Sequence, residues 1–226
     1  MTLNLFNQFK SPEILGLPTT ILAIMMIIPL LHNKPHLLGN RLTTLLTWLT
    51  KTTSKTFTTT LTAKGQKWAR LLTALFFLLL SSNLMGLLPY TMPPTALLSM
   101  NMALALPLWL GTVLTGLINK PTTALAHLLP EGSPNALSPA LILIETTSLL
   151  MRPIALGVRL TANITAGHLL ISMISLATIN LTNLSTTLSM TTLTLLTALT
   201  LLEIAVACIQ AYVFTLLLSL YLQENT

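Results

Sequence analysis

The sequence predicts an all-α polytopic membrane protein with about five membrane helices. Only 7% of its 226 residues are charged, whereas about a quarter are charged in a typical soluble domain. Hydrophobic residues make up 53% of the chain, which excludes a disordered tail, and they come in long runs. Because these runs do not alternate with polar residues, they predict helices rather than the strands of a membrane barrel. We predict a single membrane domain over residues 1–226.

The basic residues are concentrated in one early segment of the chain. Residues 32–70 carry seven basic residues and no acidic one. Short loops beside membrane spans carry such charge because it sets their orientation, and anionic lipid such as cardiolipin attracts it. A nucleic-acid-binding patch is the alternative, but a membrane loop accounts for the charge, so we expect no nucleic-acid partner.

The first predicted span covers residues 12–31, which is just long enough to cross about 30 Å of hydrocarbon. Residues 36–69 follow as a basic amphipathic segment, predicted to lie on the membrane surface as a helix. Its leucines repeat at helical spacing, and its basic residues are offset from them: Leu42, Leu45, Leu46 and Leu49 against Arg41, Lys51 and Lys55. A threonine-rich run over residues 56–62 weakens this prediction at the end of the segment.

Two further uncharged runs, residues 71–89 and 97–118, predict the second and third spans. If residues 32–70 lie on the side that positive charge favours, the N-terminus lies on the opposite side. Lys120 then returns to the favoured side without any further assumption.

Residues 137–179 and 188–222 are too long for simple spans, because as single helices they would be about 65 Å and about 50 Å long. Either each is cut into shorter pieces or both lie strongly tilted. Pro153 could break the first, but membrane helices tolerate proline, so both alternatives stay open. No internal repeat is visible, which argues against an inverted-repeat transporter.

Ionisable residues within these two segments are the functional candidates, because a charge at membrane depth is costly. They are Glu145, Arg152, Arg159, His168 and Glu203. The alternative is that some lie at helix ends and reach the lipid headgroups. This alternative suits Arg152 and Glu145 better than Arg159, which is followed by a long apolar stretch.

Spacing indicates which neighbours Arg159 has. Small residues lie on its side of the predicted helix at Ala155, Ala162 and Ala166, and small residues let another backbone approach closely. No acid lies three or four residues away, so we expect the counter-charge of Arg159 to come from another chain.

The remaining candidates fall on separate faces of the predicted helices. Glu145, Arg152 and Arg159 are seven apart and form one polar stripe. His168 faces elsewhere, and Glu203 and Gln210 share a face. An arginine stays protonated and can hold a partner carboxylate ionised, whereas His and Glu side chains can exchange protons.

We expect no metal site and no cofactor. His32 and His36 are four apart, but Pro35 interrupts the helix that a histidine pair would need. The sequence has no phosphate-binding loop and no Ser-His-acid set, so we assign no catalytic residue.

Several motifs resemble those of the ATP synthase subunit a family, in its mitochondrially encoded vertebrate form. RLTANITAGHLL, residues 159–170, looks like the family signature, and LLEIAVACIQAYVFTLLLSLYL, residues 201–222, resembles its C-terminal helix. NLMGLLPY, SMNMALALPLW and the N-terminal NLFNQF are also similar. The resemblance covers nearly the whole chain.

The resemblance implies a proton path of two half-channels beside a rotating ring of subunit c. The last two helices would form a long tilted hairpin against that ring. Arg159 matches the arginine that faces the ring carboxylate, with Asn163 and Gln210 near it. His168 and Glu203 match the half-channel on the intermembrane-space side, and Glu145 matches the matrix side.

The resemblance also implies a place in the cell and a set of partners. We expect a multi-pass protein of the mitochondrial inner membrane, with its N-terminus in the intermembrane space and its C-terminus in the matrix. The expected partners are the c-ring, the peripheral stalk subunit b and other membrane-sector subunits. Such a subunit conducts protons and is not an enzyme on its own. Arg152 departs from the family pattern, which puts a shared role for it in doubt.

Two rival functions have different requirements. A free-standing ion-coupled transporter would need its own substrate cavity and a counter-charge for Arg159, and such proteins usually contain repeats. A structural membrane anchor would leave the intramembrane charges unexplained.

Overall fold

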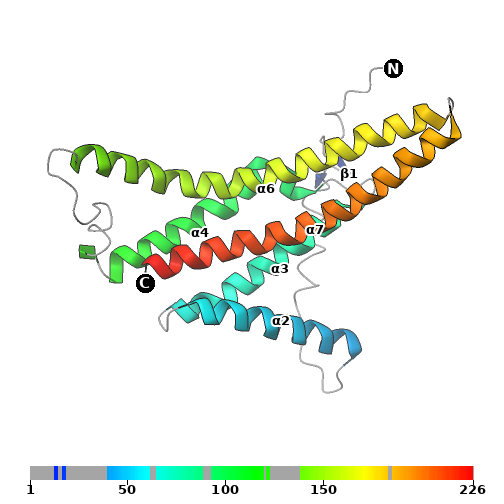
Figure 1. The fold of residues 1–226 in the computed structure, drawn as a ribbon. Coiled ribbons are helices and arrows are strands. Elements are labelled where there is room, and N and C mark those ends of the chain that lie inside the picture. The colour runs from blue at the N-terminus through cyan, green and yellow to red at the C-terminus, as the bar shows by residue number, and fades with distance from the viewer. Residues whose placement is uncertain are drawn as a thin grey trace. The chain divides into compact units, whose positions relative to one another are not determined.

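The computed structural model describes residues 13–14, 17–18, 40–61, 65–88, 93–119, 121–122, 138–182 and 185–225, which are almost all helical (Figure 1). Four helices in this part of the chain are long and apolar enough to cross a membrane. The predicted all-α polytopic fold is therefore confirmed. The chain divides into two compact units, and each unit takes pieces of several helices. The single membrane domain stays a prediction.

Little of the predicted first span falls within the described residues. Strands β1 (Glu13–Ile14) and β2 (Leu17–Pro18) pair antiparallel, with Glu13 opposite Pro18. These four residues differ from the helix that we predicted over residues 12–31. Proline has a fixed φ and no N–H, and it disfavours helical backbone at the preceding residue. The rest of this span lies outside the described residues.

The surface helix α2 (Arg41–Thr60) continues through the threonine-rich run that was expected to weaken it. The hydroxyls of Thr56, Thr58 and Thr59 donate to carbonyls three residues earlier, at 2.7, 3.0 and 2.8 Å. Each hydroxyl therefore finds an acceptor on its own helix and does not compete for a partner elsewhere. Phe57 is buried and meets Phe76 edge to face, with ring centroids 6.1 Å apart.

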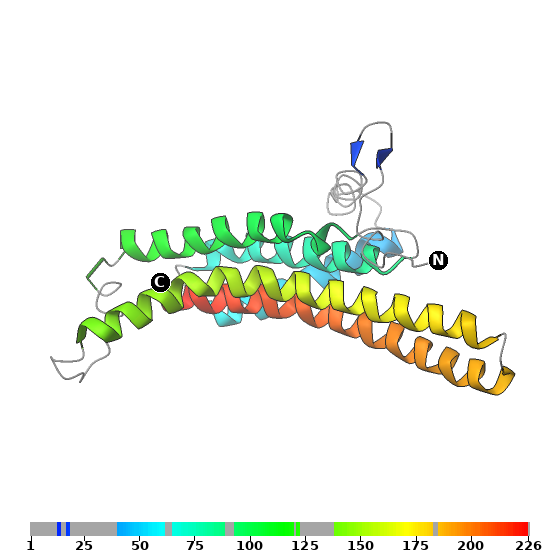
Figure 2. The same cartoon turned by 90° about the horizontal axis from the view of Figure 1, so that it is seen from above.

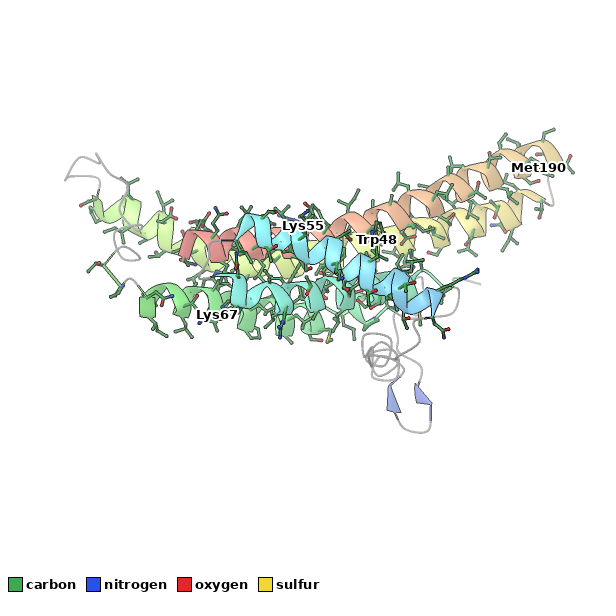
Figure 3. The ribbon with its side chains drawn as sticks, turned by 90° about the horizontal axis from the view of Figure 1, so that it is seen from below. Trp48, Lys55, Lys67 and Met190 are labelled. Carbon is green, nitrogen blue, oxygen red and sulfur yellow. The ribbon has the colours of Figure 1, made fainter. Side chains whose placement is uncertain are left out.

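The faces of α2 differ from the predicted ones. Leu46 and Leu49 are partly buried, but Leu45 is 55% exposed and Trp48 is 64% exposed. Trp48 and Lys55 lie on the side of α2 that is seen in Figure 3. The inward face is set by Phe57 and Leu61 nearer the end of the helix, which the leucine spacing at its start did not reveal.

The second and third spans lie close to their predicted positions. The short helix η2 (Gly65–Trp68) leads into α3 (Ala69–Gly86), and η3 (Pro94–Ala96) precedes α4 (Leu98–Asn119). Pro107 lies inside α4 without ending it. One of the compact units has a leucine-rich core of Leu61, Ala69, Leu72, Leu218 and Leu222, against which Trp68 and Leu108 pack.

The last two helices, α6 (Ser138–Thr182) and α7 (Thr186–Asn225), are each continuous. The two alternatives left open by their length are thus reduced to one, because neither helix is cut into pieces. Pro153 is buried within α6 and does not break it. With 45 and 40 residues they are about 65 Å and about 60 Å long, roughly twice the thickness of the hydrocarbon core. Helices of this length can lie within a bilayer only if they tilt strongly.

Polar side chains are buried while many leucines are exposed, which is the reverse of a soluble protein. The buried polar residues include Ser82, Asn83, Thr112, Gln210, Thr215 and Ser219. Leu110, Leu114, Leu143, Leu150 and Leu201 are between 47% and 68% exposed. Lipid tails solvate leucine but offer no hydrogen bonds, so polar groups lie inside a membrane protein.

A glycine at the end of α3 gives a test of the packing. A Cβ on Gly86 would collide with the Cβ of Pro93 and lie 3.3 Å from its Cα, and the proline ring cannot turn away. We expect Gly86→Ala to destabilise the protein by about 1–3 kcal/mol. Thermal unfolding of the detergent-solubilised complex measures this.

Gly157→Ala is the matched control. There the new Cβ meets the Sδ of Met102 at 2.7 Å, the far end of a flexible side chain that can move. Equal losses of melting temperature in the two variants would contradict the packing described for Gly86.

Candidate functional site

Arg159 lies on an exposed face of α6. Its side chain forms no ion pair or hydrogen bond with any other described residue, although it lies within a long apolar helix. Ala162 and Ala166, three and seven residues further on, are exposed on the same side, and Ala155 is exposed one turn earlier. The arginine therefore stands on a surface of small residues that leaves room for another helix to approach it.

His168 and Glu203 come together within one compact unit. The Nε2 atom of His168 lies 3.9 Å from the Oε1 atom of Glu203, with 23% and 10% of the two side chains exposed. Both carboxylate oxygens of Glu203 are buried and accept no hydrogen bond from the described residues. A buried carboxyl group without a hydrogen bond is costly, so this acid is not explained by packing alone.

A glycine makes room for this carboxylate. An ideal Cβ on Gly167 would lie only 2.7 Å from the Oε1 atom of Glu203 and 3.1 Å from its Cδ. Any side chain at position 167 would therefore push the Glu203 carboxylate out of its place beside His168.

Asn163 and Gln210 form a second polar contact in the same unit. The Nδ2 atom of Asn163 donates to the Oε1 atom of Gln210 at 3.4 Å. Asn163 is four residues after Arg159, so the two lie on neighbouring turns of α6. Gln210 is buried on α7 on the same face as Ala207 and Glu203. The antiparallel pieces 159–182 and 186–212 thus bring their polar residues together in the order set by their register (Figure 2).

Asn83 is a polar residue that the sequence interpretation missed. It is 3% exposed on α3, and its Nδ2 atom donates to the carbonyl of Ala207 at 3.4 Å, one turn from Glu203. Its Oδ1 atom is buried without a hydrogen bond. The signal was the run Ser81-Ser82-Asn83 inside an otherwise apolar span, which carries no charge and so attracted no interest.

Glu145 and Arg152 lie in the other compact unit, together with the last turns of α7. The Nη2 atom of Arg152 lies 3.8 Å from the Oε1 atom of Glu145, while its Nη1 atom lies 2.8 Å from the Oε2 atom of Glu224. The guanidinium also stands over the ring of Tyr221, 5.1 Å from its centroid. The sequence interpretation missed Glu224 because it lies next to the C-terminus, where a charge needs no explanation.

The described residues contain no group of three or more His, Cys, Asp or Glu side chains that could hold a metal ion. His32 and His36, the pair considered from the sequence, lie outside the described residues.

Comparisons with known proteins agree along the whole chain. The family model described as ATP synthase A chain matches residues 15–223. A Gallus gallus protein named ATP synthase F(0) complex subunit a is 63% identical over 227 residues, covering 100% of both chains. Proteins of the same name from Lycodon semicarinatus and Alligator mississippiensis are 58% and 57% identical, covering 100% and 99% of this chain and all of their own length. The chain therefore belongs to the ATP synthase A chain family.

Proposed function

We propose that this chain, the proton-translocating stator subunit of an ATP synthase, passes protons through two half-channels to and from a ring of c subunits. Protons enter past His168 and Glu203, load a ring carboxylate opposite Arg159, travel with the rotating ring, and leave past Glu145. The observation that carries the proposal is Arg159, an exposed arginine without a partner among the described residues of a long apolar helix.

The setting of Arg159 supports a charged partner on another chain. A central arginine in a membrane costs from about 2.5 to above 10 kcal/mol, and a nearby carboxylate would offset that cost. The exposed Ala155, Ala162 and Ala166 leave space for a packed helix to bring such a carboxylate close. Because arginine keeps its proton, Arg159 would also block protons from passing directly between the half-channels.

The inner faces of α6 and α7 support the entry path. His168 and Glu203 are the two proton-exchanging groups nearest to Arg159, and they face each other at 3.9 Å. His168 lies nine residues from Arg159, about 14 Å along the helix, and the amides of Asn163 and Gln210 lie between them. Amides bind water through both donors and acceptors, so they can order a water chain without trapping a proton.

Glu145 supports the exit path. It is half-buried near the start of α6, about 21 Å along the helix from Arg159. A carboxyl group that is open to water on one side can release protons that arrive from the ring.

The proposed partners are the c-ring, the peripheral stalk subunit b, other membrane-sector subunits and anionic lipid such as cardiolipin. The exposed α2 supports the last of these, because Trp48 accompanies Lys51 and Lys55 on a helix without an acid. Tryptophan favours the interface of a membrane, and lysine attracts anionic headgroups. We assign no catalytic residue to the chain itself.

Neither rival function accounts for these observations. A free-standing ion-coupled transporter would supply its own counter-charge for Arg159, and the described residues provide none. A structural anchor would not need a buried acid facing a histidine.

We also propose that the protein lies in the mitochondrial inner membrane. The N-terminus would face the intermembrane space, and the basic segment and the C-terminus would face the matrix. Seven basic residues without an acid favour the matrix side, because moving each charge against the potential costs about 2.3 kcal/mol per 100 mV.

Replacing Arg159 by lysine tests the central residue. Arg159→Lys keeps the charge but should abolish proton-driven ATP synthesis, since a lysine can lose its proton when it is desolvated. The measurement is ATP synthesis by the complex in vesicles with an imposed proton gradient. Arg70→Lys, an exposed arginine of α3, is the control and should keep its rate. Near wild-type synthesis by Arg159→Lys would sink the assigned role.

His168 and Glu203 should act on one path. Glu203→Gln and His168→Ala should each slow proton flux through vesicles stripped of the catalytic head, with Cys208→Ala as the control on α7. Because both groups serve one step, the double variant should lose less than the sum of the two losses in log rate. Fully additive losses would show that the two residues do not share a path.

The orientation can be tested with a protease and antibodies to the two termini. In mitoplasts the N-terminal epitope should be removed from outside, while residues 32–70 and the C-terminal epitope should be protected. Cleavage within residues 32–70 in intact mitoplasts would overturn the proposed orientation.

A further inference from the structure

Arg152 is the centre of an ion cluster that the proton path does not use. It forms a charge-assisted hydrogen bond of 2.8 Å to Glu224 and stands over the ring of Tyr221 at 5.1 Å. It is also 3.8 Å from Glu145. All four residues lie in one compact unit, and the cluster holds two of the five acidic residues in the whole sequence.

The two carboxylates do not share the arginine equally. At 2.8 Å the contact with Glu224 is a full hydrogen bond, whereas 3.8 Å to Glu145 is too long for one. Tyr221 and Glu224 are three apart on one face of α7, so the ring fixes the plane of the guanidinium while the carboxylate binds its end. Glu224 and Tyr221 thus draw Arg152 away from Glu145.

We propose that Glu224 and Tyr221 are positioning residues that keep Arg152 off Glu145, so that Glu145 remains free to take up and release protons. The inference rests on the proposed function, in which Glu145 lies on the exit path. An arginine bound to a carboxylate favours its ionised form. If Arg152 closed onto Glu145, that acid would be slow to accept the next proton from the ring. The pairing with Glu224 answers the charge of Arg152 before it can do so.

The proposal makes an asymmetric prediction that a purely structural ion pair does not make. Glu224→Gln frees the arginine to capture Glu145, so proton flux should fall about tenfold, the equivalent of one pKa unit of interaction. Arg152→Gln removes the arginine altogether and should leave flux within about twofold of wild type. The double variant Arg152→Gln with Glu224→Gln should then restore the flux that Glu224→Gln lost. Tyr221→Leu should give a smaller loss, about threefold.

The experiment measures proton flux in vesicles that contain the membrane sector of the synthase, stripped of its catalytic head. Gln223→Ala, an exposed change on the same turn of α7, is the matched control and should have no effect. Native gels measure how much of each variant assembles, so that flux is compared per assembled complex. If Glu224→Gln fails to assemble, the comparison of Arg152→Gln with Tyr221→Leu still decides, because only the second should lose flux.

The outcomes separate this proposal from the proton path itself. Unchanged flux in Glu145→Gln would contradict the exit path. A loss in Glu145→Gln together with unchanged flux in Glu224→Gln would leave the path intact and overturn the positioning role. Equal losses in Arg152→Gln and Glu224→Gln, or a double variant without recovery, would also overturn it, because the pair would then only hold the helices together.

Discussion

The antiparallel pairing of α6 with α7 is the interaction on which the polar chemistry of this protein depends. In one compact unit it sets His168 against Glu203 and Asn163 against Gln210, and in the other it sets Arg152 against Glu224. A shift of either helix by one residue would turn its side chains by about 100° and separate these pairs. The small residues that line the helices are therefore needed for alignment as much as for close packing.

Threonine provides most of the remaining polar surface without disturbing this arrangement. Along α2, α6 and α7 its hydroxyls donate to carbonyls three or four residues earlier, as Thr146, Thr178 and Thr194 do at 2.9, 2.6 and 2.8 Å. A hydroxyl that is satisfied by its own helix can face lipid, the protein interior or a partner at little cost. The few residues that cannot be satisfied in this way, such as Glu203 and Arg159, are the functional candidates.

The length and apolarity of the helices could be predicted from the sequence, because both are local properties of the chain. The limits of α3, α4, α6 and α7 lie within a few residues of the predicted ones. Whether Pro153 would break α6 could not be decided, since that depends on what packs around the proline. The inward face of α2 was misjudged for a similar reason: it is set by Phe57 and its contact with Phe76, far from the leucines that suggested it. At the site, every charged candidate was found by its cost in the membrane, while the partners Asn83 and Glu224 required the helix register.

Gly167 links the fold to the interpretation of genetic variants. The Glu203 carboxylate occupies the space that a side chain at position 167 would need, since a Cβ there would lie 2.7 Å from its Oε1 atom. Under the proposed path, a substitution of Gly167 by even the smallest residue would displace an acid on another helix while leaving α6 intact. A patient allele at this glycine would then produce a fully assembled enzyme with poor proton entry, and a diagnosis based on protein abundance would miss it.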